Sequence, residues 1–328
     1  MSLSDSEVLA QSRNCYDQWC VQWRDHASFI GKRFEQKSLN DFHQTGMGRA
    51  ALCIANGSSF EASIEVIKKY KSNVDVICCD KTLGHCLDNG IIPKFCVISD
   101  ANVSYETYLK PWENKLKKTI LIANVCANPK WATNGNWKDL YFVCYKDSIK
   151  SEMEFSQLSG CPNIVVASTN VSNAMVVTLT QCDNVAVRNF FGYDKILLIG
   201  YDYSWYDKYY SYNHTGNGKI NYMRGVYLND NNGDFCYSST NLIFSARWLD
   251  QYISTYKLPI INCSKKSILG ARYADLETQM QYNYRPQDSL LVQKKVKMRE
   301  ELQKQINAIN KTLENIAHDH TLQVMRSI

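Results

Sequence analysis

Short apolar runs alternate with amphipathic stretches from Arg49 onward, and the first run ends in a glycine turn. The turn at 56–59 reads Asn-Gly-Ser-Ser, and Ile64, Ile67 and Tyr70 then recur at helical spacing. This order predicts a strand, a tight turn and a helix. The first turn of a helix presents unpaired backbone N–H groups, so the junction can bind a phosphate or a carboxylate, or it can be purely structural.

The same alternation continues to residue 262. Further apolar runs predict strands at 74–79, 95–99, 119–125, 140–144, 164–167, 195–200 and 259–262. Helical spacing predicts helices at 81–89, 172–188, 241–256 and 270–282. Strands that alternate with helices favour a parallel sheet. The sequence therefore predicts an α/β fold, with a Rossmann-like, mostly parallel sheet and helices on both of its faces.

The two ends of the chain follow other patterns. Residues 5–45 carry recurrent aromatics at mostly helical spacing, which predicts one or two helices packed on the main domain. Near the other end a heptad stripe predicts a long helix that either docks on its own domain or pairs with a second copy of the chain. The stripe consists of Leu302, Ile306, Ile309, Leu313 and Ile316. The domains expected are 1–47, 48–283 and 284–328.

Residues 204–239 lose all periodicity. The stretch is dense in Tyr, Asn and Gly, too polar for a core and too aromatic for a typical disordered linker. Long loops of this kind inside a domain usually act as lids or binding loops. We therefore expect 204–239 to cover a substrate.

Composition excludes several classes of protein. No window approaches the roughly 18 apolar residues of a membrane span, and the polar N-terminus has no signal-peptide core, so a cytoplasmic protein without membrane contact is expected. The 13 cysteines include no CxxC pair, which argues for reduced thiols and against a zinc site. The net charge of +5 permits a polyanionic partner, but no basic block marks a nucleic-acid surface.

Five segments in a fixed order resemble a known family. They are the turn at 56–59, DNGIIPKFCVISD at 88–100, ASTNVSNAMVV at 167–177, LLIGYDYSW at 197–205 and INCSKKSILGARYADLE at 261–277. Together they resemble the MptE-like hydroxymethylpterin pyrophosphokinases and the motility-accessory-factor (Maf) glycosyltransferases. A more distant similarity is to bacterial sialyltransferases that use CMP-activated sugars. In the family the first turn usually reads Gly-Pro-Ser-Leu and the later strand ends in Gly-Gln-Asp-Leu, so this chain keeps the glycines and the acid.

The resemblance implies a transferase that binds a nucleotide-activated donor at the carboxyl edge of its sheet. Glycines, hydroxyls and amides there can approach a phosphate, a ribose or a base closely; alternatively they form turns and helix caps. The donor-binding candidates are Asn56, Gly57, Ser58, Ser59, Asp80, Thr169, Asn170, Ser172 and Gly200.

Two acids follow predicted strands at that edge and are the candidate catalytic carboxylates. Asp100 can hold a metal, bind a ribose hydroxyl, act as a base or cap the next helix. Asp202 repeats this arrangement, so the two can share Mg²⁺ or divide the roles of metal ligand and base. A pyrophosphoryl transfer needs metal between its phosphates, whereas transfer from a CMP-sugar can proceed without one.

His214 lies in the aromatic loop that follows Asp202. An imidazole that titrates near neutrality can take a proton from an acceptor hydroxyl; the alternative is an ordinary exposed loop histidine. Aromatic and polar neighbours suit the face of a sugar or base, or a small core within the loop. These acceptor or lid candidates are Tyr203, Trp205, Tyr210, Tyr212 and Asn213.

Three functions are compatible with these features. The first is a glycosyltransferase that moves a sugar from a nucleotide sugar to an acceptor hydroxyl on a glycan, protein, small molecule or nucleic acid. The second is a Mg²⁺-dependent pyrophosphokinase that moves diphosphate from ATP to a pterin-like alcohol. The third is a non-catalytic nucleotide-binding or assembly protein, organised as a homo-oligomer through its C-terminal helix.

Overall fold

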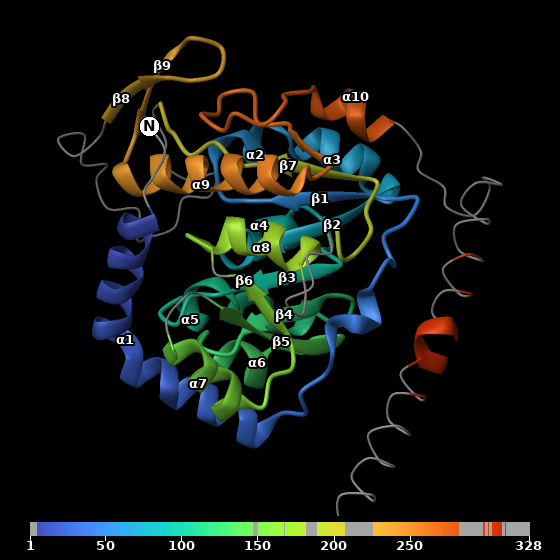
Figure 1. Ribbon diagram of the computed structural model, residues 1–328. Helices are drawn as coiled ribbons and strands as arrows, with labels where there is room; N and C mark the ends of the chain where they lie inside the picture. Colours follow the sequence, from blue (N-terminus) through green and yellow to red (C-terminus); the bar gives the residue numbers. More distant parts are fainter. Residues whose placement is uncertain are drawn as a thin grey trace, which may run out of the picture. The chain divides into compact units, whose positions relative to one another are not determined.

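The computed structural model describes residues 5–146, 150–166, 168–181, 189–206 and 226–281, together with positions 298, 301, 304–309 and 312 (Figure 1). The chain divides into two compact units, 1–284 and 285–328. Of the heptad stripe, Ile306 and Ile309 lie in a described helical segment and are exposed, whereas Leu302, Leu313 and Ile316 lie outside the described residues. Within the described residues, no helix is both long enough and apolar enough to cross a bilayer.

An eight-stranded sheet organises the first unit, with the order β10-β7-β1-β2-β3-β4-β5-β6. All neighbouring strands in it are parallel. The strands are β1 (Ala50–Ile54), β2 (Val74–Cys79), β3 (Phe95–Ile98), β4 (Ile120–Asn124), β5 (Asp139–Lys146), β6 (Ile164–Val166), β7 (Lys195–Ile199) and β10 (Ile260–Asn262). Every strand expected from the apolar runs is present, which confirms the predicted α/β fold with a parallel sheet.

The helices confirm the alternation and add elements that the periodicity did not predict. The long helix α1 covers most of the aromatic N-terminal stretch, α5 is the short helix that Asp100 was expected to precede, and α6 and α7 were not expected. The helices are α1 (Asp5–Arg33), η1 (Leu39–Phe42), α2 (Ser58–Ala62), α3 (Ile64–Tyr70), η2 (Lys71–Asn73), α4 (Asp80–Asp88), α5 (Tyr105–Tyr108), η3 (Lys110–Lys115), α6 (Lys130–Asn134), α7 (Lys150–Ser159), α8 (Val171–Thr180), α9 (Thr240–Tyr256) and α10 (Leu276–Gln281). The predicted helix at 172–188 is seen to Thr180; 182–188 lie outside the described residues.

The chain reverses its direction across the sheet once, and this reversal places the helices on both faces. From β1 it proceeds strand by strand to β6, returns through α8 to β7 on the other side of β1, and continues to β10. Because parallel crossovers are right-handed, the first series of helices covers one face and α8 and α9 cover the other (Figure 1). Two separate buried clusters, one under α1 to α7 and one under α8 and α9, match this division.

A β-hairpin interrupts the stretch at 204–239, for which the sequence predicts no regular structure. β8 (Val226–Asn229) pairs antiparallel with β9 (Phe235–Ser238). Its turn is held by Asp230, whose carboxylate accepts hydrogen bonds from the backbone N–H groups of Asn232 at 2.8 Å and Asp234 at 3.0 Å. The Asn-Gly-Asp sequence of that turn was a hairpin signal, but the strands beside it are only four residues long, too short for a clear period.

A buried carboxylate near the amino ends of the strands predicts how the stability of the fold depends on pH. Asp75, the second residue of β2, binds Arg49 Nε at 2.9 Å, Lys94 Nζ at 2.5 Å and the Tyr193 hydroxyl at 2.9 Å. Burial alone would raise the pKa of Asp75, but the charges of Lys94 and Arg49 outweigh burial and hold it below its usual value. The ion cluster therefore stabilises the fold above about pH 4 and loses its effect as pH falls through the lowered pKa.

Asp75→Asn should lower the free energy of unfolding by about 2–4 kcal/mol near neutral pH, because it leaves two cations without their buried partner. The difference from the wild type should shrink in acid. Urea unfolding at a series of pH values measures this. Asp139→Asn is the matched control, since Asp139 and Lys37 form a half-exposed pair for which about 1 kcal/mol or less is expected. A loss that is constant from neutral to acid pH would contradict the charge-based explanation.

Candidate functional site

Three loops meet at the carboxyl edge of the sheet, after β1, β7 and β10, and glycines let them touch. Gly57 donates its N–H to the Gly200 carbonyl at 2.9 Å. A Cβ on Gly57 would lie 2.5 Å from that oxygen, and one on Gly200 would lie 2.0 Å from the Ala55 carbonyl oxygen. Gly200 also has a φ of +77°, which glycine adopts readily. The two glycines are therefore required by the close approach of the β1 and β7 loops.

The carboxylate of Asp202 accepts hydrogen bonds from the backbone and side chains of the 56–59 turn. It accepts from Ser59 N at 2.9 Å, from Ser58 Oγ at 3.2 Å and from Ser59 Oγ. Asp202 is 1% exposed, and burial raises its pKa although the bonds from Ser59 and Ser58 partly offset this. The place expected for a donor phosphate is thus filled by a carboxylate of the chain itself.

Ser264, after β10, closes this junction. Ser59 Oγ, whose proton goes to Asp202, lies within hydrogen-bond distance of Ser264 Oγ at 3.0 Å, and Ser264 Oγ accepts from the Tyr201 N–H at 3.1 Å. The segment 261–277 resembled the family at the sequence level, and its Ser264 is now seen to fix the β7 loop. Sequence alone did not single out this serine.

The polar residues before α8 mostly cap that helix. Asn170 Oδ1 accepts from the Asn173 N–H at 2.9 Å, and Thr169 Oγ1 accepts from Asn173 Nδ2 at 2.7 Å. The Ser172 carbonyl accepts from the Tyr201 hydroxyl at 2.8 Å. Capping was one of the two alternatives for these residues, and the structure uses their polar atoms in that way.

Tyr203 and Trp205, expected in an acceptor-binding loop, are buried. Tyr203 is 7% exposed, and its hydroxyl donates to Asn173 Oδ1 at 2.5 Å. Trp205 is 4% exposed, exchanges backbone hydrogen bonds with Tyr237 and stacks on its ring. Both side chains complete the core beneath α8 and the hairpin, because the chain leaving β7 turns inward before it reaches the surface. Packing was one of the two alternatives for these aromatics, and their role as substrate contacts stays a prediction.

Tyr210, Tyr212, Asn213 and His214 lie outside the described residues. Their predicted roles in acceptor binding and proton transfer therefore stay predictions.

Asp100 and Asp202 do not form a shared metal site. Asp202 follows β7 and Asp100 follows β3, with β1 and β2 between those strands. Three strand spacings correspond to about 14 Å, whereas each oxygen ligand lies about 2.1 Å from a bound Mg²⁺. The carboxylate that neighbours Asp100 is Asp80, which follows the adjacent strand β2. No group of three or more His, Cys, Asp or Glu side chains suited to a metal occurs within the described residues.

Asp80 has an unusual environment for a carboxylate at this edge. It follows β2 as the first residue of α4 and is 1% exposed. Its Oδ1 accepts from the Lys81 N–H at 2.6 Å, while its buried Oδ2 has no hydrogen-bond partner among the described residues. Burial raises the pKa of Asp80 to about 6; Lys81 opposes the shift and the charge of Asp100 adds to it. A capping role therefore accounts for only one of its two oxygens.

Asp100 is exposed, and it lies in a loop whose backbone is held by hydrogen bonds. Its Oδ1 accepts from the Asn102 N–H at 2.8 Å, and its carbonyl accepts from the Asn128 N–H at 3.3 Å. The second bond connects the loop after β3 to the loop after β4. The carboxylate of Asp100 is therefore exposed to solvent, and hydrogen bonds hold the loop that carries it.

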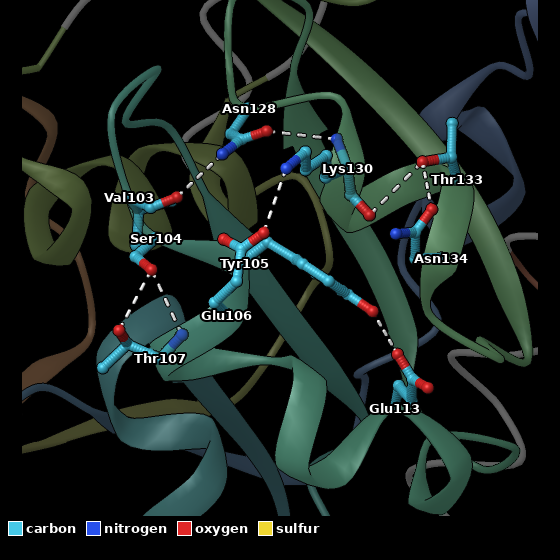
Figure 2. A network of polar contacts seen from close by, with 10 residues as sticks. All are labelled: Val103, Ser104, Tyr105, Glu106, Thr107, Glu113, Asn128, Lys130, Thr133 and Asn134. Atoms are coloured by element: carbon cyan, nitrogen blue, oxygen red, sulfur yellow. Dashed lines mark hydrogen bonds and ion pairs between the residues drawn. The ribbon is translucent and has the colours of Figure 1, made fainter.

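A network of polar contacts extends this bracing across both loops (Figure 2). Asn128 Nδ2 donates to the Val103 carbonyl at 3.0 Å, and Asn128 Oδ1 accepts from the Lys130 N–H at 3.1 Å. Lys130 Nζ pairs with Glu106 at 3.0 Å, and the Tyr105 hydroxyl binds Glu113. Such bonds hold the backbone of the two loops, and with it the side chain of Asp100, at a constant geometry.

Proton transfer is the chemistry that this arrangement supports best. A carboxyl group whose pKa lies near 6 is mostly ionised at neutral pH and still basic enough to accept a proton from a hydroxyl. The exposed Asp100 beside it can orient a hydroxyl or help to hold a divalent cation through water and phosphate oxygens. The sequence named Asp80 only as a donor-binding candidate; its raised pKa depends on burial, which no local pattern reveals.

Comparisons with known proteins agree with the fold. A family model described as "6-hydroxymethylpterin diphosphokinase MptE-like" matches residues 29–208, more than half of the chain. Among solved structures, a MAf glycosyltransferase from Magnetospirillum magneticum AMB-1 is similar, with a TM-score of 0.57 and 18% sequence identity. The match covers 80% of this chain and 40% of that chain. No curated protein matches the sequence.

Proposed function

We propose, from the premise that this chain belongs to the MptE-like family, that it is a transferase which moves a group from a nucleotide-linked donor to an acceptor hydroxyl. The observation that carries the proposal is the buried Asp80 carboxylate, which has one unpartnered oxygen at the carboxyl end of β2. Ligands of open α/β sheets bind outside the carboxyl ends of the strands. A base is needed there because a neutral hydroxyl is a weak nucleophile.

Glycosyl transfer is our first choice of reaction. The acceptor oxygen would attack the anomeric carbon of a nucleotide sugar as the bond to the nucleotide phosphate breaks. Asp80 would receive the acceptor's proton, the new glycosidic bond would form, and the free nucleotide would leave with the electron pair of the broken bond. Asp100 would orient the hydroxyl from the neighbouring strand. The similarity in fold to the MAf glycosyltransferase over most of this chain supports this choice.

Diphosphoryl transfer from ATP to a pterin-like alcohol is the second candidate, and the description of the matching family model favours it. The same proton transfer would apply, with AMP as the leaving product. Mg²⁺ would then neutralise the phosphates. Asp100 is the described carboxylate placed to contact such an ion, because it is exposed whereas Asp202 is buried.

A panel of nucleotide donors tests the proposal. The purified chain would be incubated with several nucleotide sugars and with ATP, each with and without Mg²⁺ or Mn²⁺, while binding is followed by calorimetry and products by chromatography. Release of free nucleotide from a nucleotide sugar supports the first reaction, and AMP from ATP in the presence of Mg²⁺ supports the second. No binding by any donor would contradict both and leave a structural or assembly role.

The cellular setting and the oligomeric state belong to the same proposal. A nucleotide-dependent transferase of this kind would act in the cytoplasm on a small-molecule donor. The exposed Ile306 and Ile309 are consistent with pairing of the C-terminal helix with a second copy, which sedimentation of the full chain would test.

A further inference from the structure

Helix α1 brings a histidine to the same edge of the sheet. Gln22 Nε2 donates to Asn102 Oδ1 at 3.1 Å, and His26, one turn later, contacts the Cys126 carbonyl at 2.9 Å through Nδ1. Asn102 belongs to the loop after β3, and Cys126 to the loop after β4. Residues four apart lie on one face of a helix, so this face of α1 lies against the carboxyl-edge loops.

The contact with Cys126 determines which ring nitrogen of His26 carries the proton. A carbonyl oxygen only accepts hydrogen bonds, so Nδ1 must be the donor. In the neutral ring Nε2 then keeps a free lone pair. Nε2 has no partner among the described residues and is not one of their buried unpartnered atoms, so it reaches solvent. A histidine oriented in this way is a ready hydrogen-bond acceptor.

The neighbours of His26 hold this part of α1 against the domain. Ala27 and Ile30, on the same helix, are buried in the core. Arg24 forms an ion pair with Glu154 of α7 at 2.8 Å, and Trp23 packs edge-on against Phe155. Figure 1 shows α1 running along α7. Ordering of this kind reduces the entropy lost when the side chain binds a ligand.

The position of His26 relative to Asp80 fits one extended substrate. Asp80 follows β2 and Cys126 follows β4, two strands away, which corresponds to about 10 Å along the sheet edge. A nucleotide-linked donor is long enough to span that distance. The braced Asp100 loop lies between them and is tied to the Cys126 loop through Asn128.

We propose that His26 is a substrate-contacting residue, whose Nε2 accepts a hydrogen bond from a hydroxyl of the nucleotide-linked substrate. This inference rests on the proposed function. It differs from the sequence expectation, in which His214 was the functional histidine and the aromatic N-terminal helix was a packing element.

Two substitutions separate contact with substrate from a structural role. The amide nitrogen of asparagine reaches about as far as Nδ1, so His26→Asn keeps the bond to Cys126 and removes Nε2. Glutamine reaches about as far as Nε2, so His26→Gln loses the bond to Cys126 and keeps a polar atom at the solvent end. We expect His26→Asn to lower turnover about 10- to 100-fold at an unchanged melting temperature. His26→Gln should lower the melting temperature and retain more turnover.

The opposite pattern would overturn the inference. If His26→Asn behaves as the wild type and only His26→Gln is impaired, then His26 does no more than anchor the Cys126 loop.

Chemical labelling provides a readout that does not depend on turnover. Diethyl pyrocarbonate acylates unprotonated imidazole, and peptide mass spectrometry reports the rate at His26. We expect His26 to be labelled in the free protein and to be protected at least about 5-fold by whichever nucleotide or nucleotide sugar binds in calorimetry.

The labelling result also separates the two proposals. A donor that binds while His26 is labelled at an undiminished rate overturns the role of His26 and leaves the transferase proposal intact. Absence of binding by every donor in the panel overturns the transferase proposal, and the role of His26 with it. Protection by AMP or CMP alone places the hydroxyl on the ribose; protection only by an intact nucleotide sugar places it on the transferred sugar.

Discussion

Asp80→Asn should abolish most of the transferase activity while it makes the protein more stable at neutral and alkaline pH. The amide cannot accept the proton of an acceptor hydroxyl, so turnover should fall about 10²- to 10⁴-fold. The amide oxygen can still accept the Lys81 N–H bond. The variant therefore removes the chemistry of the side chain and preserves its structural contact.

The stability gain follows from the raised pKa. The folded protein holds the Asp80 proton up to a pKa of about 6, whereas the unfolded chain releases it near pH 4, so about 2 pH units separate the two. Ionisation therefore destabilises the fold progressively as pH rises through this window, by about 3 kcal/mol in total. Asp80→Asn lacks this penalty and should exceed the wild type by about 1–3 kcal/mol near pH 8. Below about pH 4 the two should be equal.

Urea unfolding at several pH values, together with turnover of the donor that binds, measures both effects. Glu65→Gln is the matched control, because Glu65 is an exposed carboxylate whose side chain is 83% accessible. We expect it to change neither turnover nor the pH dependence of unfolding. An Asp80→Asn variant that is less stable than the wild type near pH 8 would show that Asp80 is a structural cap. Retained turnover would remove it from the reaction.

Gly200→Ala should have the largest effect on folding of the substitutions considered. The new Cβ would lie 2.0 Å from the Ala55 carbonyl oxygen, and the residue has a φ of +77°. The strained backbone should destabilise by about 1–2 kcal/mol, and the clash with a buried backbone atom by about 1–3 kcal/mol more. The β1 and β7 loops would separate and weaken the contact of Asp202 with the 56–59 turn.

Gly233→Ala isolates the backbone part of this effect. Gly233 has a φ of +87° in the hairpin turn, and a Cβ at this position would meet no other atom within 4 Å. It should therefore show the strain of about 1–2 kcal/mol without the clash. Urea unfolding of both variants gives the difference. Equal losses at the two glycines would mean that the contact between the β1 and β7 loops adds nothing to stability.

Sequence periodicity was sufficient for the sheet and insufficient for the hairpin. The strands of the sheet are buried on both faces, as their apolar runs required. β8 and β9 have four residues each, and their turn is anchored by distant groups; the Asn231 N–H, for example, donates to the Ser267 carbonyl at 2.9 Å. Contacts of that kind leave no periodic trace in the local sequence.

The candidate site, too, was predicted in part by the sequence and decided in part by packing. Sequence order placed Asp80, Asp100 and Asp202 after strands, hence at one edge of a parallel sheet, because the carboxyl ends of parallel strands meet there. Sequence order could not show which of these carboxylates has its hydrogen bonds satisfied by groups of the protein. The fold gives Asp202 three hydrogen-bond donors from the 56–59 turn and leaves one oxygen of Asp80 buried without a partner.

The sequence by itself determined the α/β class, the strands of the sheet and the edge at which chemistry is expected, since each depends on local apolar runs and chain order. The tertiary structure alone decided strand order, the depth of each carboxylate and the approach of α1 to the loops after β3 and β4. His26 and Cys126 are separated by 100 residues and are joined by a single hydrogen bond. Burial and such long-range contacts are properties of packing, and they set both the pKa of Asp80 and the orientation of His26.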